Sequence, residues 1–398
     1  MNPHWSAYAI VFAVAAGTTL VATPLVRRVA FMIGAVVAPD ARRVHDRRTP
    51  TLGGAAMLVG VLVAMGVAWR LGDFDDVFAA TSEMVGVVLA VTVIWMVGVV
   101  DDLRDVTAPA KLAGMIVAGS ILSLSGLSLL VLRIPLLDVF VLSPDLSAVL
   151  TVVWVIGMAN AINLIDGLDG LAAGIVAIGA GAIFFYGIEL VNEDVLEASS
   201  PGPLLAIIAA GACVGFLPHN FHPARIFMGD GGALLLGLLL AASTISVGGR
   251  TGEEFTGQTY FFFAPIFIPL FILGVPIVDT AFAIVRRASQ RSSITTPDKG
   301  HLHHRLLALG HGQRRSVLIL WLWTALLSVT VLVPTYTGRG VLIAVFALGG
   351  LALALYTVFA PGVRRRRHRR RVEELLEVHP AGRALTRVRA TDREETAT

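Results

Sequence analysis

The 398-residue sequence contains one cysteine, only two lysines and few charges of either sign. The single Cys213 excludes an intramolecular disulfide and any Cys-x-x-Cys metal or redox site. Asp, Glu, Lys and Arg make up 15% of the residues and hydrophobic residues 56%, which leaves too little polar surface for a water-soluble protein. Neither lysine follows a glycine, so the chain has no Walker A loop for ATP. These absences leave the class of integral membrane proteins.

Long uncharged stretches recur along the chain. A helix needs about 17 to 25 mostly apolar residues to cross a bilayer, and only helices and closed barrels leave no backbone group unpaired there. The alternating pattern of barrel strands is absent, and the first stretch has too few basic residues before it for a cleavable signal peptide. We therefore predict an all-α polytopic membrane protein with about eleven transmembrane helices, at 1–26, 49–69, 84–100, 112–132, 146–165, 170–188, 198–224, 231–249, 255–278, 316–338 and 340–363.

The basic residues are distributed unevenly between the two faces that these spans define. If the spans alternate in direction, 27 of the 31 bases lie on one face, which predicts that this face is cytoplasmic, with the N-terminus outside and the C-terminus inside. Residues 1–363 then form one membrane domain. The Arg-rich segment 364–398 is expected to be a partly disordered cytoplasmic tail that binds anionic lipid heads. The β-branched segment 133–145 is a candidate for a small β-hairpin on the outer face.

Three acids lie together where the third predicted span meets the cytoplasm, namely Asp101, Asp102 and Asp105. The dipole at a helix C-terminus opposes negative charge there. Solvated charges that simply end a membrane helix are the plain alternative. Three acids within five residues instead favour a divalent cation site, or a base held near a phosphate.

Two further acidic motifs follow in other predicted cytoplasmic connections. Asn163, Asp166 and Asp169 are spaced by three, so they can share one face, although a turn with N-cap aspartates is the alternative reading. Asp230 directly precedes the eighth predicted span and is flanked by glycines. Such a helix N-terminus suits phosphate oxygens or a phosphate bridged by a cation.

Basic residues accompany these acids. Lys111, just inside the fourth predicted span, is a candidate for phosphate contact or for an interface anchor whose ammonium reaches out to water. The last cytoplasmic loop contains His301, His303, His304 and Arg305. Because the motif has no cysteine, phosphate contact fits it better than zinc.

The predicted topology brings four separate connections to one face. Asp101, Asp166, Asp230 and His301 can therefore meet in one cleft that opens to the cytoplasm. Asp279 would be costly against lipid and is expected to face the same interior. A transporter would place its acids near mid-span, so this pattern favours an interfacial enzyme.

Five ordered stretches resemble the polyprenyl-phosphate N-acetylhexosamine-1-phosphate transferases. They are Arg42 to His45 with Thr49 to Gly54, Asp101 to Asp105, Asn160 to Gly170, Asn220 to Gly232, and His301 to His304. The His-Leu-His-His form of the last stretch looks like the N-acetylglucosamine branch, because the muramoyl-pentapeptide branch usually has three consecutive histidines. The overall appearance is most similar to actinobacterial members that use decaprenyl phosphate.

This resemblance implies the transfer of N-acetylglucosamine-1-phosphate from UDP-N-acetylglucosamine to a polyprenyl phosphate, with Mg²⁺ or Mn²⁺ as cofactor. The products are polyprenyl-diphospho-N-acetylglucosamine and UMP, made at the cytoplasmic face of the cell membrane as the first step of a cell-wall polysaccharide or linker pathway. Relatives are commonly homodimers, and no nucleic acid is involved. Phospho-N-acetylmuramoyl-pentapeptide transfer is the alternative within the family, and an ion-coupled transporter using Asp101, Asp166 and Asp279 is the alternative outside it.

A mechanistic hypothesis assigns the residues as follows. Asp230 holds the metal with Asp102 as a second ligand, and Asp101 takes the proton from the lipid phosphate, which attacks the β-phosphorus. In a two-step alternative an aspartate attacks first and forms a covalent intermediate. Asp166 and Asp169 complete the catalytic set. By resemblance, Asn163, Asp166, Asn220 and Phe227 lie near the nucleotide, and His301, His303, His304 and Arg305 lie near the diphosphate or sugar.

Overall fold

The computed structural model describes residues 3–37, 48–79, 81–134, 138–250, 306, 311–337 and 345–357, and it describes no side chains for residues 133–139. Several predictions fall outside the described residues. These are the motif at 42–45, the ninth span at 255–278, Asp279, the tail 364–398, and the residues His301, His303, His304 and Arg305.

Eight described helices are long and apolar enough to cross a membrane. Two shorter apolar helices, α5 (Ala108–Leu124) and the helix Val345–Thr357, accompany them. The described chain is therefore a polytopic helical membrane bundle, as the uncharged stretches predict. The eight are α1 (Trp5–Met32), α2 (Gly53–Arg70), α4 (Thr81–Arg104), α6 (Pro144–Ile165), α7 (Leu171–Asn192), α8 (Gly202–Asn220), α9 (Gly229–Gly248) and α13 (Gln313–Thr337).

Proline and a capping serine mark where several helices begin. α6 starts at Pro144, and the Ser143 hydroxyl accepts a hydrogen bond from the Leu146 N–H at 3.4 Å. α5 and α8 also carry a proline in the first turn, at Pro109 and Pro203. Proline is tolerated there because the first N–H groups of a helix have no partner within the helix.

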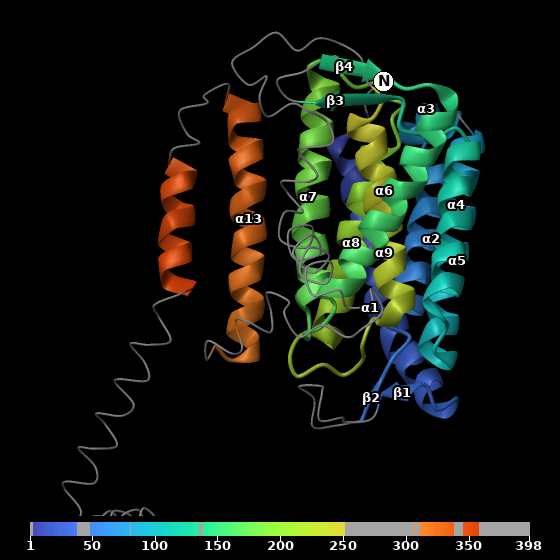
Figure 1. The fold of residues 1–398 in the computed structure, drawn as a ribbon, viewed down its shortest axis with the longest axis vertical. Helices are drawn as coiled ribbons and strands as arrows, with labels where there is room; N and C mark the ends of the chain where they lie inside the picture. Colours follow the sequence, from blue (N-terminus) through green and yellow to red (C-terminus); the bar gives the residue numbers. More distant parts are fainter. Residues whose placement is uncertain are drawn as a thin grey trace, which may run out of the picture.

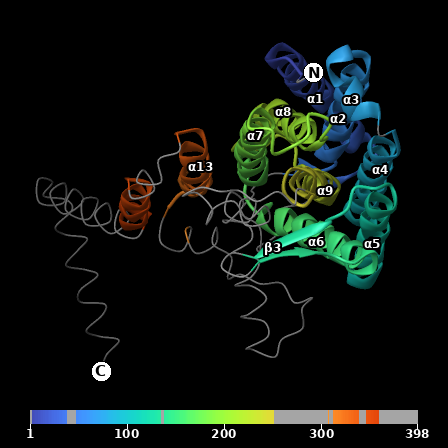
Figure 2. The same ribbon diagram turned by 90° about the horizontal axis from the view of Figure 1, so that it is seen from above.

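Helix α9 is the centre of the bundle. It packs against α2, α4, α6 and α8, which surround it in the view from above (Figure 2). Every residue from Gly231 to Gly248 is buried, so a helix that is apolar on all sides suits this position. At Gly237 a Cβ atom would overlap Ala159 of α6, and this glycine therefore permits close packing of the two helices.

Short strand pairs mark the two ends of the bundle (Figure 1). At one end β1 (Val36–Val37) pairs antiparallel with β2 (Thr49–Pro50). At the other end β3 (Val131–Ile134) pairs antiparallel with β4 (Asp138–Val141), with Val131 opposite Val141, so the segment 133–145 contains most of a hairpin. We refer to these as the β1–β2 end and the β3–β4 end. The short helices η1 (Gly72–Phe74) and α3 (Asp75–Ala79) also lie toward the β3–β4 end.

A bidentate ion pair closes the bundle near the β3–β4 end. Arg250, just after α9, donates to both carboxylate oxygens of Glu83 at 2.9 and 2.6 Å and to the Gly126 carbonyl at 3.1 Å. Paired guanidinium and carboxylate groups of this geometry fix orientation as well as position. They hold the far end of α9 against the start of α4.

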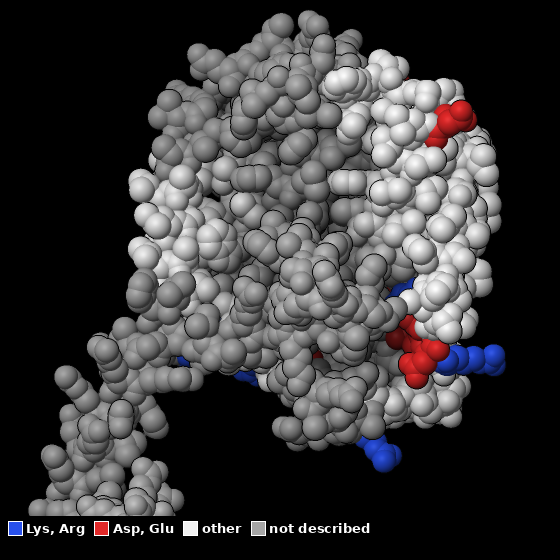
Figure 3. Space-filling model, viewed as in Figure 1, with Lys and Arg blue, Asp and Glu red and all other residues white. Residues whose placement is uncertain are grey.

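On the face of the molecule seen in Figure 3, the charges of the described residues lie toward the two ends. Uncharged atoms cover the middle of the described surface in Figure 3, and acidic and basic atoms gather toward the β1–β2 end, with one acidic group at the other end. Apolar side chains such as Val21 and Trp69 are 76% and 61% exposed. An uncharged belt between charged ends is what a bilayer requires.

Candidate active site

Two chain segments meet at the start of α9. The Phe227 N–H donates to the Pro50 carbonyl at 2.9 Å, and the Gly53 and Gly54 N–H groups donate back to the carbonyls of Phe227 and Met228 at 2.9 and 2.8 Å. This short ladder ties the first turn of α2 to the loop that carries Asp230. A Cβ atom at Gly54 would lie 2.5 Å from the Gly232 Cα, so only glycine permits this approach.

A glycine also brings α4 against the start of α9. A Cβ atom at Gly98 would lie 2.5 Å from the Gly231 Cα. Gly229 adopts a positive φ of 71°, which favours glycine because it has no Cβ atom. The last turn of α4 and the first turn of α9 are therefore in backbone contact, which places Asp101 and Asp102 beside Asp230.

The carboxylate of Asp102 caps α9 from a neighbouring helix. It accepts hydrogen bonds from the N–H groups of Asp230 at 2.9 Å and Gly231 at 3.2 Å. The Thr51 hydroxyl donates to the same carboxylate at 3.4 Å. A negative group is favourable at a helix N-terminus, where N–H groups lack partners within the helix. Asp102 therefore fixes the direction of the first α9 amides.

Lys111 of α5 lies between two carboxylates. Its ammonium is 2.8 Å from Asp101 Oδ2 and forms a second ion pair with Asp230. The other Asp101 oxygen accepts from the Val106 N–H at 2.7 Å. The three side chains are only 15 to 30% exposed, so water screens these charges less than it would at the surface. The arrangement is a pair of acids held together by one internal cation.

Asp166 ends α6 close to the same acids. Burial, together with the negative charges of Asp230, Asp102 and Asp169, raises the pKa of Asp166 to about 8. Its N–H donates to the Asn163 carbonyl at 3.2 Å. The Asn163 side-chain N–H₂ is buried and has no hydrogen-bond partner among the described residues. This corner therefore has a carboxyl group and an amide available for a ligand.

Asp169 and Asn220 hold the next two loops together. The Asp169 carboxylate, 3% exposed as a residue, lies 2.7 Å from His222 Nδ1 and accepts from the Ala224 N–H at 3.0 Å. The Asn220 amide accepts from the Gly170 N–H and donates to the Ile226 carbonyl, both at 3.0 Å. Both side chains join the α6–α7 connection to the α8–α9 connection, which contains Phe227.

The structure thus brings most of the predicted residues to one end of the bundle. Asp101, Asp102, Lys111 and Asp230 are in direct contact as described above. Asp105 is exposed, with a left-handed φ of 47°, and its side chain has no hydrogen bond or ion pair in the part of the chain described. The contacts of Thr51 with Asp102 and of His222 with Asp169 are not predicted from the sequence. In each pair the two residues are more than 50 positions apart, so no local spacing connects them.

The side chains of the site include carboxylates, which are the usual protein ligands of Mg²⁺ and Mn²⁺. Among the described residues no group of three or more His, Cys, Asp or Glu side chains is arranged to hold an ion. Asp101 and Asp230 nevertheless already share one cation, the Lys111 ammonium. Mg²⁺ is usually held by one or two carboxylates, with waters and substrate phosphates completing its shell. The carboxylates of Asp101 and Asp230 therefore fit Mg²⁺ or Mn²⁺.

Comparison with known proteins identifies the class. A model of glycosyl transferase family 4 matches residues 84–248. The chain is 38% identical over 327 residues to the decaprenyl-phosphate N-acetylglucosaminephosphotransferase of Mycobacterium tuberculosis, with 80% of each chain covered. The enzyme of the same name from Mycobacterium leprae is 39% identical, with 80% of this chain and 82% of that one covered. The chain therefore belongs to glycosyl transferase family 4 and is a phosphotransferase.

Within the family, the chain is similar over most of its length to members that are named for N-acetylglucosamine. A probable undecaprenyl-phosphate N-acetylglucosaminyl 1-phosphate transferase of Bacillus subtilis is 37% identical over 324 residues, which cover 81% of this chain and 84% of that one. A phospho-N-acetylmuramoyl-pentapeptide-transferase of Streptomyces avermitilis is 31% identical over 247 residues and covers only 56% of this chain. The predicted resemblance to the N-acetylglucosamine branch is confirmed.

Proposed function

We propose that this protein transfers N-acetylglucosamine-1-phosphate from UDP-N-acetylglucosamine to a polyprenyl phosphate, releasing UMP. The similarity to the mycobacterial and Bacillus enzymes supports the donor and acceptor classes. The observation that carries the proposal is the position of Lys111 between Asp101 and Asp230 at the start of α9. A cation, two acids and a helix N-terminus are the groups that phosphate transfer with a divalent metal requires. Homodimerisation stays a prediction.

The β1–β2 end is proposed to face the cytoplasm. It carries the acids of the site, and 27 of the 31 bases fall on that side when the eleven predicted spans alternate. The positive-inside bias then puts the N-terminus outside. A cytoplasmic site is consistent with a nucleotide-sugar donor, because the charged UDP-sugar does not cross the bilayer unaided.

Asp230 and Asp101 are proposed as the residues that hold Mg²⁺ or Mn²⁺. The bound ion would neutralise phosphate charge and polarise the β-phosphorus. Asp102, predicted as a second ligand, already accepts from two α9 N–H groups and from Thr51. We assign it to positioning: it fixes the first turn of α9 so that Asp230 keeps its direction.

Lys111 is proposed to exchange partners during substrate binding. Without substrate it neutralises Asp101 and Asp230. When the anionic phosphates arrive, its ammonium turns to them, since a primary ammonium on a flexible stem reaches more than one partner. Both carboxylates are then released, Asp230 for the metal and Asp101 for the metal or the proton of the lipid phosphate.

In the transfer step an oxygen of the lipid phosphate forms a bond to the β-phosphorus of the donor. The bond from that phosphorus to the oxygen bridging the two phosphates breaks, and UMP leaves. A phosphate monoester has its second pKa near about 6, so most of the acceptor is already a dianion at neutral pH. As a base Asp101 would act only on the protonated remainder, whereas its proposed part in holding the metal is needed for every acceptor molecule.

Nucleotide recognition is proposed for the corner that contains Asn163 and Asp166. The Asn163 N–H₂ group is buried without a partner among the described residues, and a buried donor of this kind is favourable only if a ligand completes it. Asp169 and Asn220 are assigned to positioning, because their hydrogen bonds hold the two loops that frame this corner.

The first test compares Asp101→Asn and Asp230→Asn with Asp145→Asn, a control in the first turn of α6 at the opposite end. Membranes that contain each variant are supplied with UDP-N-acetylglucosamine and polyprenyl phosphate, and UMP is measured. Both site variants should lose UMP release by at least about a hundredfold, because removal of one such group typically costs 10²- to 10⁴-fold. The control should keep full activity. Full activity in the site variants would refute the assignment.

An ion-coupled transporter is the rival of another class. Its acids would lie near mid-span, whereas Asp101, Asp166 and Asp230 lie at one end of their helices. Substrate uptake into sealed vesicles without UMP release would favour the transporter over the enzyme.

A further inference from the structure

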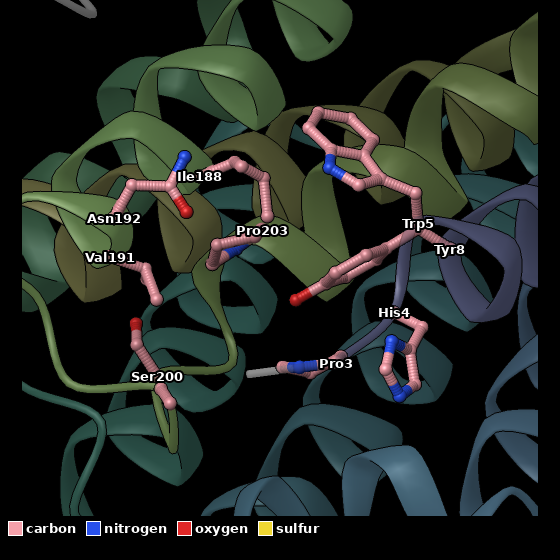
Figure 4. Close-up of a pocket in the computed structure, with 10 residues that line it drawn as sticks. Pro3, His4, Trp5, Tyr8, Ile188, Val191, Asn192, Ser200 and Pro203 are labelled. Carbon is pink, nitrogen blue, oxygen red and sulfur yellow. The ribbon is translucent and has the colours of Figure 1, made fainter. Parts of the chain in front are cut away.

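A cavity at the β3–β4 end lies far from the site described above. It is enclosed by the start of α1, the end of α7 and the start of α8, with His4, Trp5, Tyr8, Asn192, Ser200 and Pro203 among its lining (Figure 4). The 19 residues of α8 separate the two ends, a length of roughly 28 Å at about 1.5 Å per residue. The cavity holds about 200 Å³, roughly six times the ~30 Å³ that one water occupies. It is therefore large enough for a small organic group.

The hydroxyl of a buried tyrosine opens into this cavity. Tyr8 is 4% exposed, and Figure 4 shows its oxygen directed into the space between Pro203, Ser200 and Pro3. Its ring packs edge-on against Phe74 and Phe184, each with centroids 5.1 Å away, so it cannot rotate out. The hydroxyl makes no hydrogen bond to a described residue, and its oxygen is open to the cavity rather than sealed inside the protein. Its partner is therefore whatever fills the cavity, either water or the polar group of a ligand.

The remaining lining indicates the charge of the ligand. No Lys or Arg lines the cavity. Asn192 donates to Glu189 at 3.5 Å, which leaves its amide oxygen available, and the His4 N–H donates to Asp73 at 3.1 Å. Carboxylates thus lie behind two of the lining residues. Oxygen acceptors, nearby acids and the indole of Trp5 suit an organic ammonium group. The Tyr8 O–H suits an oxygen atom of the same ligand, a few bonds away from the ammonium.

The membrane surface beside the cavity indicates that the ligand continues into lipid. Trp5 is 57% exposed and lies 6.2 Å from the ring of Phe185, which is 46% exposed. Tryptophan at the first residue of a spanning helix is typical of the membrane interface. An amphipathic molecule can therefore place its polar head in the cavity and its chains along these exposed rings.

We propose that this cavity binds the aminoethyl phosphate head of a phospholipid from the leaflet at the β3–β4 end. The ammonium donates to the Asn192 amide oxygen, and a phosphate oxygen accepts from the Tyr8 hydroxyl. The proposal is independent of the transferase activity, because it concerns the opposite end of the bundle.

Native mass spectrometry of the full-length, delipidated protein tests this proposal. The protein is titrated with phosphatidylethanolamine, with phosphatidylglycerol of the same acyl chains, and with soluble glycerophosphoethanolamine. Phosphatidylethanolamine should bind as one tight equivalent, with phosphatidylglycerol at least about fivefold weaker, the factor expected for one hydrogen bond. Equal binding of the two lipids would overturn the head-group assignment. Soluble glycerophosphoethanolamine binding as tightly as the lipid would overturn the membrane source.

Two variants keep the test independent of folding. Tyr8→Phe removes the hydroxyl, and Asn192→Ala changes an exposed rim residue. Both should weaken phosphatidylethanolamine about fivefold; Tyr8→Phe should also weaken phosphatidylglycerol, which carries the same phosphate oxygens, whereas Asn192→Ala should leave phosphatidylglycerol unchanged. Tyr356→Phe, on the separate helix Val345–Thr357, is the matched control and should change neither. Unchanged binding in both cavity variants, or only ordered water in the cavity of a lipid-bound structure, would contradict the proposal.

Discussion

The ammonium of Lys111 on α5 forms an ion pair with the carboxylate of Asp230 on α9, a residue 119 positions away in the sequence. The same ammonium is 2.8 Å from Asp101 of α4. One side chain therefore joins three helices at the β1–β2 end. This internal cation occupies the place between the two acids that is proposed above for the divalent metal.

Replacing Lys111 with methionine separates metal binding from catalysis. The variant leaves Asp101 and Asp230 uncompensated, so Mn²⁺ should bind the substrate-free protein more tightly, by about tenfold or more, given about 4 kcal/mol for unit charges 4 Å apart at an intermediate dielectric. UMP release should fall, because the phosphates lose their ammonium partner. Electron paramagnetic resonance of Mn²⁺ measures the affinity. Lys111→Arg, which keeps the charge, should not tighten binding; weaker Mn²⁺ binding in Lys111→Met would contradict the exchange of partners.

Gly54 is predicted to tolerate no side chain. A Cβ atom there would lie 2.5 Å from the Gly232 Cα, and backbone cannot yield as a flexible side chain can. Gly54→Ala should lower the thermal midpoint in detergent and strongly reduce UMP release. Gly66→Ala, on the same helix with nothing within 4 Å of its Cβ, should be neutral or slightly stabilising. Equal behaviour of the two variants would show that the contact of α2 with α9 is unimportant.

Thr51→Val is predicted to act through Asp102. The substitution removes a hydroxyl that donates to the Asp102 carboxylate at 3.4 Å, while the two α9 N–H groups still hold it. We expect a several-fold fall in kcat with little change in KM for the nucleotide sugar, the pattern of a lost positioning contact. Thr81→Val, whose hydroxyl bonds the Phe78 carbonyl far from the site, is the control. A rise in KM alone, with kcat unchanged, would instead assign Thr51 to binding of the nucleotide sugar.

Asp166 gives the metal-free protein a pH-dependent stability. Its pKa of about 8 in the folded protein, raised by burial and by the neighbouring acids, compares with about 3.9 for an unfolded aspartate. A folded-state pKa above the unfolded value contributes stability that is complete below about pH 4 and is lost as pH rises through 8. In a chelator the thermal midpoint should therefore fall between about pH 4 and 8 and level off above pH 8. Asp166→Asn should reduce this fall, and an unchanged slope would contradict the assigned pKa.

The sequence predicted the chemistry of the site better than its contacts. Alternating spans bring Asp101, Asp166 and Asp230 to one face, and the structure places them at one end of the bundle. Lys111 was a candidate for phosphate contact or for an interface anchor, and its bridge between two acids follows only from how α5 packs beside α4.

Long-range partners were beyond sequence reasoning for a physical reason. Thr51 meets Asp102 because Gly54 and Gly98 let α2 and α4 approach the first turn of α9, and no local pattern encodes that approach. The spacing of Asp166 and Asp169 predicts that they share a face, whereas the burial of Asp169 against His222 depends on a loop more than 50 residues later. Helix periodicity reveals which residues share a face but not which loop covers them.

The most direct test of the central claim is UMP release by purified protein in lipid bilayers that contain polyprenyl phosphate, with UDP-N-acetylglucosamine or UDP-N-acetylmuramoyl-pentapeptide as the donor. The account predicts UMP and polyprenyl-diphospho-N-acetylglucosamine from the first donor, dependence on Mg²⁺ or Mn²⁺, and no product with Asp230→Asn. Product from the pentapeptide donor alone, or full activity of Asp230→Asn, would contradict it.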